Sequence, residues 1–165
     1  MPDYSYETLL VEKKNNILII TLNRPERLNA INETMHHELE DVFATVGVDP
    51  EIGAVVVTGS GRGFCSGGDV RAMNERGGST ALANRPLGAV SQSGRRLFHN
   101  MLWVEQPVIC ALNGVAAGLG ATIALFCDIV YASDRARIGD THVRAGLVAG
   151  DGGAVVWPLL IGMSK

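Results

Sequence analysis

The sequence lacks the features that mark three large classes of protein. No apolar run approaches the roughly 18 residues that a membrane-spanning helix requires, so we expect no membrane partner. Lys and Arg total 14 against 17 Asp and Glu, which argues against a broad basic face for nucleic acid. The three cysteines, an odd number, do not suit a disulfide framework. They predict free, buried thiols in a reducing compartment, by default the cytoplasm.

Several common enzyme motifs are also incomplete. Residues 59–64 lack the third glycine of a dinucleotide-binding fingerprint, and no P-loop Lys-Ser pair occurs. The residue two positions before Ser66 is Phe64 rather than glycine, so the Gly-x-Ser-x-Gly pattern of a nucleophile elbow is absent. The pair His36 and His37 is not followed by the further histidine of a helical zinc site. These gaps predict neither a metal nor a separate cofactor.

Glycine, by contrast, is abundant: 20 of 165 residues, about 12%, where roughly 7% is usual. Twelve of the 20 lie in residues 59–68, 114–120 and 146–153. Backbone that needs positive φ, or that approaches a ligand or a neighbouring strand closely, tolerates such density. The density alone leaves two interpretations open, namely three tight strand-to-helix turns or one site built from three backbone loops.

Hydrophobic patterning predicts an α/β fold with a largely parallel sheet, because buried strands alternate with helices. Residues 6–13 and 17–22 predict a hairpin, and the β-branched run 54–58 predicts a strand buried on both faces. In sheets of this kind, ligands collect where glycine-rich loops leave the carboxyl ends of strands. The other expected elements are strands at 108–112, 129–132 and 136–139, helices at 70–75, 89–104 and 121–127, and a loop at 76–88.

Two helices carry more specific expectations. Asn32 is placed to cap a helix, because apolar side chains recur after it at the spacing of one helical face. Those side chains are Met35, Leu39, Val42, Phe43 and Val46. Asp151 opens a final apolar helix, which Pro158 is expected to kink or to end.

Four segments together resemble the crotonase superfamily, the enoyl-CoA hydratase/isomerase family. They are LNRPERLNA at 22–30, FCSGGDV at 64–70, PVICALNG at 107–114 and ALFCDI at 124–129. The resemblance implies a ββα spiral and a single crotonase-like core domain over residues 1–165. The helical part that follows in the family, and that usually completes its trimer, is missing from this chain. A homotrimer or hexamer is therefore a weaker expectation than for the family.

The resemblance also implies a site that binds an acyl-CoA substrate, with coenzyme A entering as part of that substrate. Two backbone N–H groups would polarise the thioester carbonyl, and by position they belong to Gly68 and Leu119. Leu119 stands where the family usually has glycine, so its side chain either narrows the acyl pocket or packs beneath the sheet. Residues implied in contact with coenzyme A or substrate are Arg27, Ala30, Ser66, Gly68, Asp69, Val70 and Arg71.

The chain departs from the family where hydratases carry two glutamates, because Thr122 and His142 occupy those positions. Threonine is not a base near pH 7, so standard hydratase chemistry is doubtful. His142 and Asp151 are nine residues apart across a glycine-rich turn and form a candidate acid–base pair, as in β-diketone hydrolases of this superfamily. Alternatively, Asp151 only caps a helix and His142 faces solvent. Asp140 and Asp69 are other candidate carboxylates.

These observations predict an enoyl-CoA hydratase/isomerase-family enzyme that stabilises a thioester enolate and uses a His/Asp acid–base pair. Two alternatives remain. The same pair could activate water to hydrolyse a β-diketone or an acyl thioester. The loss of both glutamates is also compatible with a catalytically silent protein that binds coenzyme A.

Overall fold

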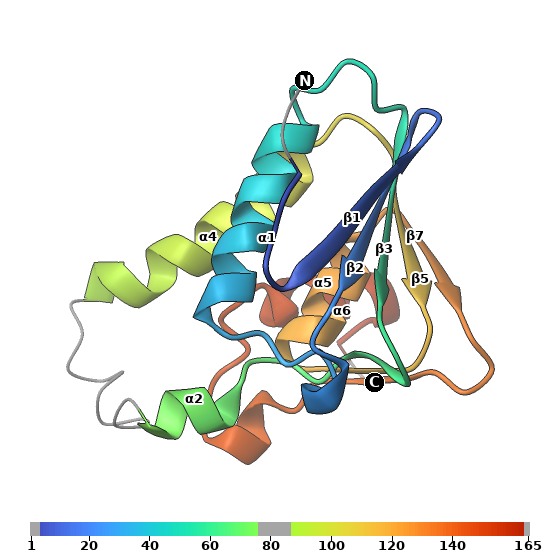
Figure 1. Ribbon diagram of the computed structural model, residues 1–165. Helices are drawn as coiled ribbons and strands as arrows, with labels where there is room; N and C mark the ends of the chain where they lie inside the picture. The colour runs from blue at the N-terminus through green and yellow to red at the C-terminus, as the bar shows by residue number, and fades with distance from the viewer. Residues whose placement is uncertain (1–3, 76–86, 164–165) are drawn as a thin grey trace.

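The computed structural model describes residues 4–75 and 87–163, and it contains two sheets with helices packed beside them (Figure 1). The larger sheet has the strand order β1-β2-β3-β5-β7, and the smaller has the order β4-β6-β8. Among the described residues, only β1 (Leu9–Lys14) and β2 (Ile17–Leu22) pair antiparallel, as the predicted hairpin. All the other strand pairs are parallel, which confirms the predicted fold class.

A repeated ββα unit generates both sheets. In each repeat the first strand joins the larger sheet, the second joins the smaller sheet, and a helix follows. The first repeat is β3 (Ala54–Gly59), β4 (Gly63–Cys65) and α2 (Val70–Glu75). The second is β5 (Val108–Leu112), β6 (Val115–Ala117) and α5 (Leu119–Phe126). The third is β7 (Ile129–Ala132), β8 (Arg137–Gly139) and α6 (Gly153–Ile161), with the short helix η2 (His142–Ala145) before α6.

Helix α1 (Glu33–Val46) supplies much of the core. The Oδ1 atom of Asn32 accepts the backbone N–H of Met35 at 2.9 Å, so the predicted cap is present. All five apolar side chains predicted for its inner face are completely buried. They join a core that also contains the inward side chains of β2, β3 and β5. Helix α4 (Leu87–Trp103) packs against α1 beside the larger sheet (Figure 1).

The structure corrects three sequence expectations. Strand β3 alternates between buried and half-buried residues, so it is not fully buried on both faces. Helix α6 does not end at Pro158 but continues to Ile161. Strands β4 and β6 lie inside the first two glycine clusters and were not predicted. Most of the predicted loop at 76–88 lies outside the described residues, and Leu87 and Gly88 already belong to α4.

The cysteines and the membrane expectation can also be compared with the structure. Cys65, Cys110 and Cys127 are free and buried, as predicted. In the part of the chain that the structure describes, no helix combines the length and apolar character needed to cross a bilayer.

Candidate active site

The smaller sheet places the candidate residues together. Strands β4, β6 and β8 are parallel neighbours, so their carboxyl ends meet at one edge. Residues 66–68 follow β4, Gly118 and Leu119 follow β6, and Asp140 follows β8. Ligand sites in parallel sheets favour this edge. The first two glycine-rich loops thus follow the short second strands of their repeats, β4 and β6, rather than the long buried strands from which the sequence led us to expect them.

The loops after β4 and β6 are in close contact. Gly67 has a φ of 97°, and a Cβ atom there would lie 2.8 Å from the Ala117 carbonyl oxygen and 3.7 Å from the Leu119 nitrogen. Only glycine therefore fits at position 67. Neither the Gly68 nor the Leu119 N–H has a hydrogen-bond acceptor among the described residues. Both donors are therefore available to a ligand at this edge.

Leu119 begins α5, where the first N–H groups of a helix have no acceptor within the helix and the helix dipole favours negative charge. Its side chain is half-buried and packs against the hydrophobic core. The next residue, Gly120, allows α5 to start directly against β4, since a Cβ there would lie 2.4 Å from the Cys65 carbonyl oxygen. Of the two expectations for the Leu119 side chain, the structure therefore shows packing against the core.

His142 and Asp151 are brought together by the turn between η2 and α6. The Nε2 atom of His142 lies 2.9 Å from Oδ2 of Asp151, and the two side chains are only 12% and 17% exposed. The histidine ring packs beside Gly118, because a Cβ on that glycine would lie 3.6 Å from its Cε1 atom. The ring is therefore adjacent to the loop that presents the Leu119 N–H.

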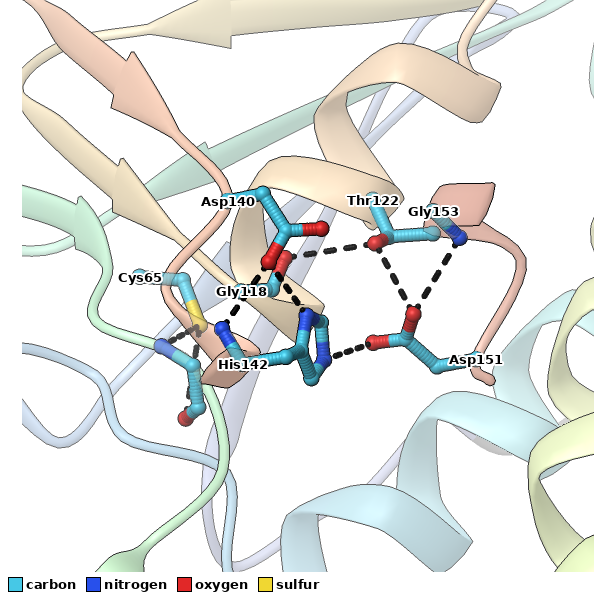
Figure 2. Close-up of polar contacts among 8 residues, drawn as sticks. Cys65, Gly118, Thr122, Asp140, His142, Asp151 and Gly153 are labelled. Atoms are coloured by element: carbon cyan, nitrogen blue, oxygen red, sulfur yellow. Dashed lines mark hydrogen bonds and ion pairs between the residues drawn. The ribbon is translucent and has the colours of Figure 1, made fainter. Parts of the chain in front are cut away.

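The second ring nitrogen contacts Asp140, which Figure 2 shows at a different edge of the ring from Asp151. Oδ1 of Asp140 lies 2.8 Å from Nδ1 of His142 and accepts the His142 backbone N–H at 2.9 Å. Partial burial of Asp140 acts to raise its pKa, but its hydrogen bonds with the backbone N–H and the ring of His142 outweigh that effect and lower the pKa. Asp140 therefore supports His142 rather than standing alone as a carboxylate.

Asp151 has partners on two helices. Its Oδ1 atom accepts the Gly153 N–H at 3.2 Å, at the first residue of α6, and lies 3.3 Å from the hydroxyl of Thr122 on α5 (Figure 2). Thr122 is completely buried, and its hydroxyl is also 3.2 Å from the Gly118 carbonyl oxygen. The same carboxylate therefore accepts the N–H of the first residue of α6 and contacts His142, although Gly152 rather than Asp151 is the N-cap residue of that helix.

Cys65 lies at the same edge, but its side chain is completely buried. Burial raises the pKa of its thiol to about 12, which leaves it protonated near neutral pH. Its sulfur accepts the Gly67 N–H at 3.4 Å and so helps to shape the loop after β4. No group of three or more His, Cys, Asp or Glu side chains suited to a metal ion occurs within residues 4–75 and 87–163.

A second part of the candidate site is a polar cleft of about 420 Å³ between the η1 turn (Pro25–Arg27), α1 and α2. Of the residues that the resemblance links to coenzyme A, Arg27, Asp69 and Arg71 line it. The other four do not line it. Ala30 is buried, Ser66 donates its hydroxyl to the Arg27 carbonyl, Gly68 lies in the loop after β4, and Val70 is half-exposed.

Arg24 and Asp69 form an ion pair within this cleft, at 3.1 Å between Nη1 and Oδ2, with both side chains less than one-fifth exposed. The same Nη1 atom donates to the Ala30 carbonyl. Partial burial acts to raise the pKa of Asp69, but the Ala72 N–H and the Arg24 guanidinium outweigh it and lower the pKa. Asp69 is thus a structural carboxylate rather than a substitute for a missing glutamate.

Sequence reasoning assigned no role to two residues of the first motif and missed the part played by Asp140. Arg24 and the completely buried Asn29 hold the chain around the cleft. Nδ2 of Asn29 donates to the carbonyls of Ser60, Gly63 and Phe64, which fixes the approach to β4. The positive φ of Asn29, 55°, marks a turn, but its partners lie more than 30 residues away in sequence.

For Asp140, the available signal in the sequence was an Asp two residues before a candidate histidine.

Comparisons with known proteins show the family of the chain. The family model for enoyl-CoA hydratase/isomerase matches residues 12–165. The chain is 38% identical over 160 residues to 1,2-epoxyphenylacetyl-CoA isomerase of Escherichia coli, and the match covers 96% of this chain and 60% of that protein. It is 35% identical to crotonyl-CoA hydratase of Syntrophomonas wolfei, with coverage of 96% and 59%.

A solved enoyl-CoA hydratase/isomerase from Mycobacterium paratuberculosis superimposes with a TM-score of 0.86 at 37% identity. That match covers 97% of this chain and 63% of the solved chain. The chain thus spans about 60% of the length of these relatives. On its sequence and its fold, the chain belongs to the enoyl-CoA hydratase/isomerase family of the crotonase superfamily.

Proposed function

We propose that this chain is the acyl-CoA-binding core of an enzyme that forms a thioester enolate, with the His142–Asp151 pair as its acid–base group. The observation that carries the proposal is the 2.9 Å contact between His142 Nε2 and Asp151 Oδ2, beside the loop that begins α5. A carboxylate that holds an imidazole stabilises its charged form and fixes its orientation, which makes the pair effective in proton transfer.

The thioester carbonyl would be held by the N–H groups of Gly68 and Leu119. Both groups lack an acceptor among the described residues, and their loops meet at the same edge of the smaller sheet. Backbone donors are fixed before negative charge develops on the oxygen, and loss of one such donor typically costs about 2.7–4 kcal/mol of transition-state stabilisation. The start of α5 adds the favourable field of a helix N-terminus.

A single acid–base pair favours double-bond isomerisation over hydration. In isomerisation, the pair removes a proton from one carbon, the C–H electrons move onto the thioester oxygen, and the same proton returns to another carbon. Hydration by the usual route of this family needs two separate carboxylates, one for water and one for the α-carbon. Thr122 occupies one of those positions and cannot act as a base near neutral pH.

The polar cleft would accept the coenzyme A portion of the substrate. Arg24, Arg27 and Arg71 line it, and guanidinium groups bind phosphate oxygens well because their donors form a planar fork. Because Arg24 is already paired with Asp69, Arg27 and Arg71 are the better candidates for phosphate. On this proposal coenzyme A enters as part of the substrate.

A second candidate activity is hydrolysis of a β-diketone or an acyl thioester. The His142–Asp151 contact favours it, because an imidazole held by a carboxylate also activates water. In this reaction the attacking water gives its proton to the pair, and the enolate or thiolate leaves with a proton returned from it. The two activities share the His142–Asp151 pair and the N–H groups of Gly68 and Leu119, and they differ in whether water attacks.

The test is an activity panel on the full 165-residue chain, using crotonyl-CoA hydration, 3-enoyl-CoA isomerisation, acyl-CoA hydrolysis and diketone cleavage. We expect isomerisation, and we expect His142→Ala to lower kcat by about 10²–10⁴-fold, the usual range for loss of a general acid–base group. His99→Ala is the matched control, because this exposed histidine on α4 contacts Trp103 rather than the site. The control should retain wild-type kcat.

The outcomes separate the candidates. Turnover that is indifferent to His142→Ala would remove the pair from the mechanism. Hydrolysis without isomerisation would establish the second candidate. Tight binding of coenzyme A with no turnover on any substrate would identify a silent binding protein. Far-ultraviolet circular dichroism of each variant confirms that lost activity is not lost folding.

A further inference from the structure

We propose that Asp140 is a positioning residue of the candidate site and that, with Asp151, it holds His142 as an imidazolium. Both ring nitrogens then donate, Nδ1 to Asp140 and Nε2 to Asp151. This inference rests on the proposed function, because it specifies how the same acid–base pair carries its proton.

The first support is the way Asp140 fixes the imidazole. One oxygen, Oδ1, receives both the backbone N–H and the ring Nδ1 of His142, at 2.9 and 2.8 Å. Two bonds from one residue to one oxygen tie the ring orientation to the backbone. Asp140 itself follows β8 directly, and the last residue of that strand, Gly139, accepts the Gly118 N–H at 3.1 Å. The position of the ring is thus fixed relative to the loop that presents the Leu119 N–H.

The second support is the number of donors and acceptors around the ring. An ionised carboxylate only accepts hydrogen bonds, whereas a neutral imidazole has one N–H and one lone pair. A neutral His142 between Asp140 and Asp151 would therefore point a lone pair at a carboxylate. The imidazolium donates from both nitrogens and satisfies both acceptors, with charge assistance at each bond.

Among the described residues, no charged group other than Asp140 and Asp151 is in hydrogen-bond contact with the ring. Helices α5 and α6, which pack around the site, have no charged residue in their sequences. The Cys65 thiol on β4 stays neutral because burial raises its pKa to about 12. Arg144 on η2 and Arg137 on β8 are exposed. Asp140 and Asp151 are therefore the charged groups in hydrogen-bond contact with His142 among the described residues.

This arrangement places an acid and a base within one hydrogen bond. The Asp151 carboxylate would accept a proton from one substrate carbon, and Nε2–H would give its proton to another. The proton on Asp151 would then pass along the hydrogen bond to Nε2, which restores both groups. The role of Asp140 is indirect, because its carboxylate holds Nδ1–H on the side of the ring away from Asp151 (Figure 2). An Asp140 variant should therefore alter proton transfer rather than substrate binding.

The first experiment measures the protonation of the ring by ¹⁵N nuclear magnetic resonance on the labelled full chain at pH 7. We expect two protonated ring nitrogens for His142 in the wild type and one in Asp140→Asn and Asp140→Ala. The Asn side chain can turn its NH₂ toward Nδ1, so a neutral ring with its proton on Nε2 satisfies both partners. The Ala variant removes the Nδ1 partner altogether. His142→Ala identifies the signals.

The second experiment measures kcat and KM separately for the substrate that the activity panel identifies. We expect Asp140→Asn to lower kcat by about a hundredfold with KM within about twofold, a smaller loss than the ~10⁴-fold effect of the equivalent change in a serine-protease triad. Asp134→Asn is the matched control, because it removes the same charge from an exposed turn that contacts Ser133 rather than His142. The control should retain both constants and both ring signals.

A wild-type ring with one protonated nitrogen would overturn the proposal, and so would Asp140 variants with unchanged ring signals. A loss confined to KM would also overturn it, because a positioning residue for proton transfer acts on kcat. The resonance measurement needs no turnover. An inactive chain with a doubly protonated ring would therefore contradict the proposed function while it supports the placement of Asp140.

Discussion

The two ends of the described chain bury their apolar side chains to very different degrees. Every apolar side chain on the inner face of α1 is completely buried, and the same holds for the inward residues Val55 and Val57 of β3. In the third repeat, all four residues of β7 are exposed, and α6 buries only Gly153 and Val156. Leu159 on α6 is 78% exposed.

The comparison bears on the candidate site, because His142 and Asp151 belong to the less buried region. Their positions are set mainly by polar contacts with Asp140, Thr122 and Gly153, and less by close packing. Gly68, by contrast, lies in the loop after β4 and bridges to the core residue Ile31, and Leu119 begins α5 and packs against the core. The carbonyl-binding half of the proposed site is therefore built on the rigid part, and the proton-transfer half on the weakly packed part.

The largest expected effect comes from the same substitution, leucine to alanine, made once on α1 and once on α6. Leu39→Ala removes a completely buried side chain from α1, and loss of such a leucine costs about 2–5 kcal/mol of unfolding free energy. Leu159→Ala removes the same atoms from the exposed face of α6 and should change the value by less than about 0.5 kcal/mol. Urea unfolding followed by circular dichroism measures both. Equal losses would show that α6 is packed as tightly as α1.

A smaller effect is expected from the ion pair that joins two loops of the rigid region. Arg24→Ala leaves the Asp69 carboxylate and the Ala30 carbonyl without their shared donor, and hydrogen bonds to charged groups contribute about 1.5–3 kcal/mol. The matched control is Arg71→Ala, an exposed arginine of the same cleft, for which we expect less than about 0.5 kcal/mol. Urea midpoints report both changes, and similar midpoints for the two variants would contradict a structural role for the pair.

Most of the long elements could be predicted from the sequence because their patterns are local. The apolar spacing after Asn32 gave the inner face of α1 residue by residue, and the apolar run before Asn113 gave the bounds of β5. Strands β4 and β6 have three residues each, too few for alternation to be visible, and both lie among glycines. The edge that carries the site was therefore predicted only through the glycine clusters around it.

The side-chain contacts of the site divide in the same way. The His142–Asp151 pairing was suggested by the sequence because the two residues are only nine positions apart, across a glycine-rich turn. Arg24 and Asp69 are 45 residues apart and meet only when η1 lies beside α2, so no local pattern indicates their contact. Asp140 was considered only as a replacement for a glutamate, because its direction toward the ring depends on the turn after β8.

The smallest expected effect concerns acid stability in the rigid region. The folded state lowers the pKa of Asp69 below its ordinary value of 3.8, because the Ala72 N–H and Arg24 outweigh the effect of partial burial. An unfolded chain therefore binds this proton more readily, so the contribution of Asp69 is complete above pH 4–5 and is lost as the pH falls through the lowered pKa. The difference in unfolding free energy between the wild type and Asp69→Asn should be nearly constant from pH 6 to about pH 5 and should shrink from there to pH 3. Urea titrations at several pH values measure it, and a difference that stays constant over this range would show that the Arg24–Asp69 contact does not favour the ionised carboxylate.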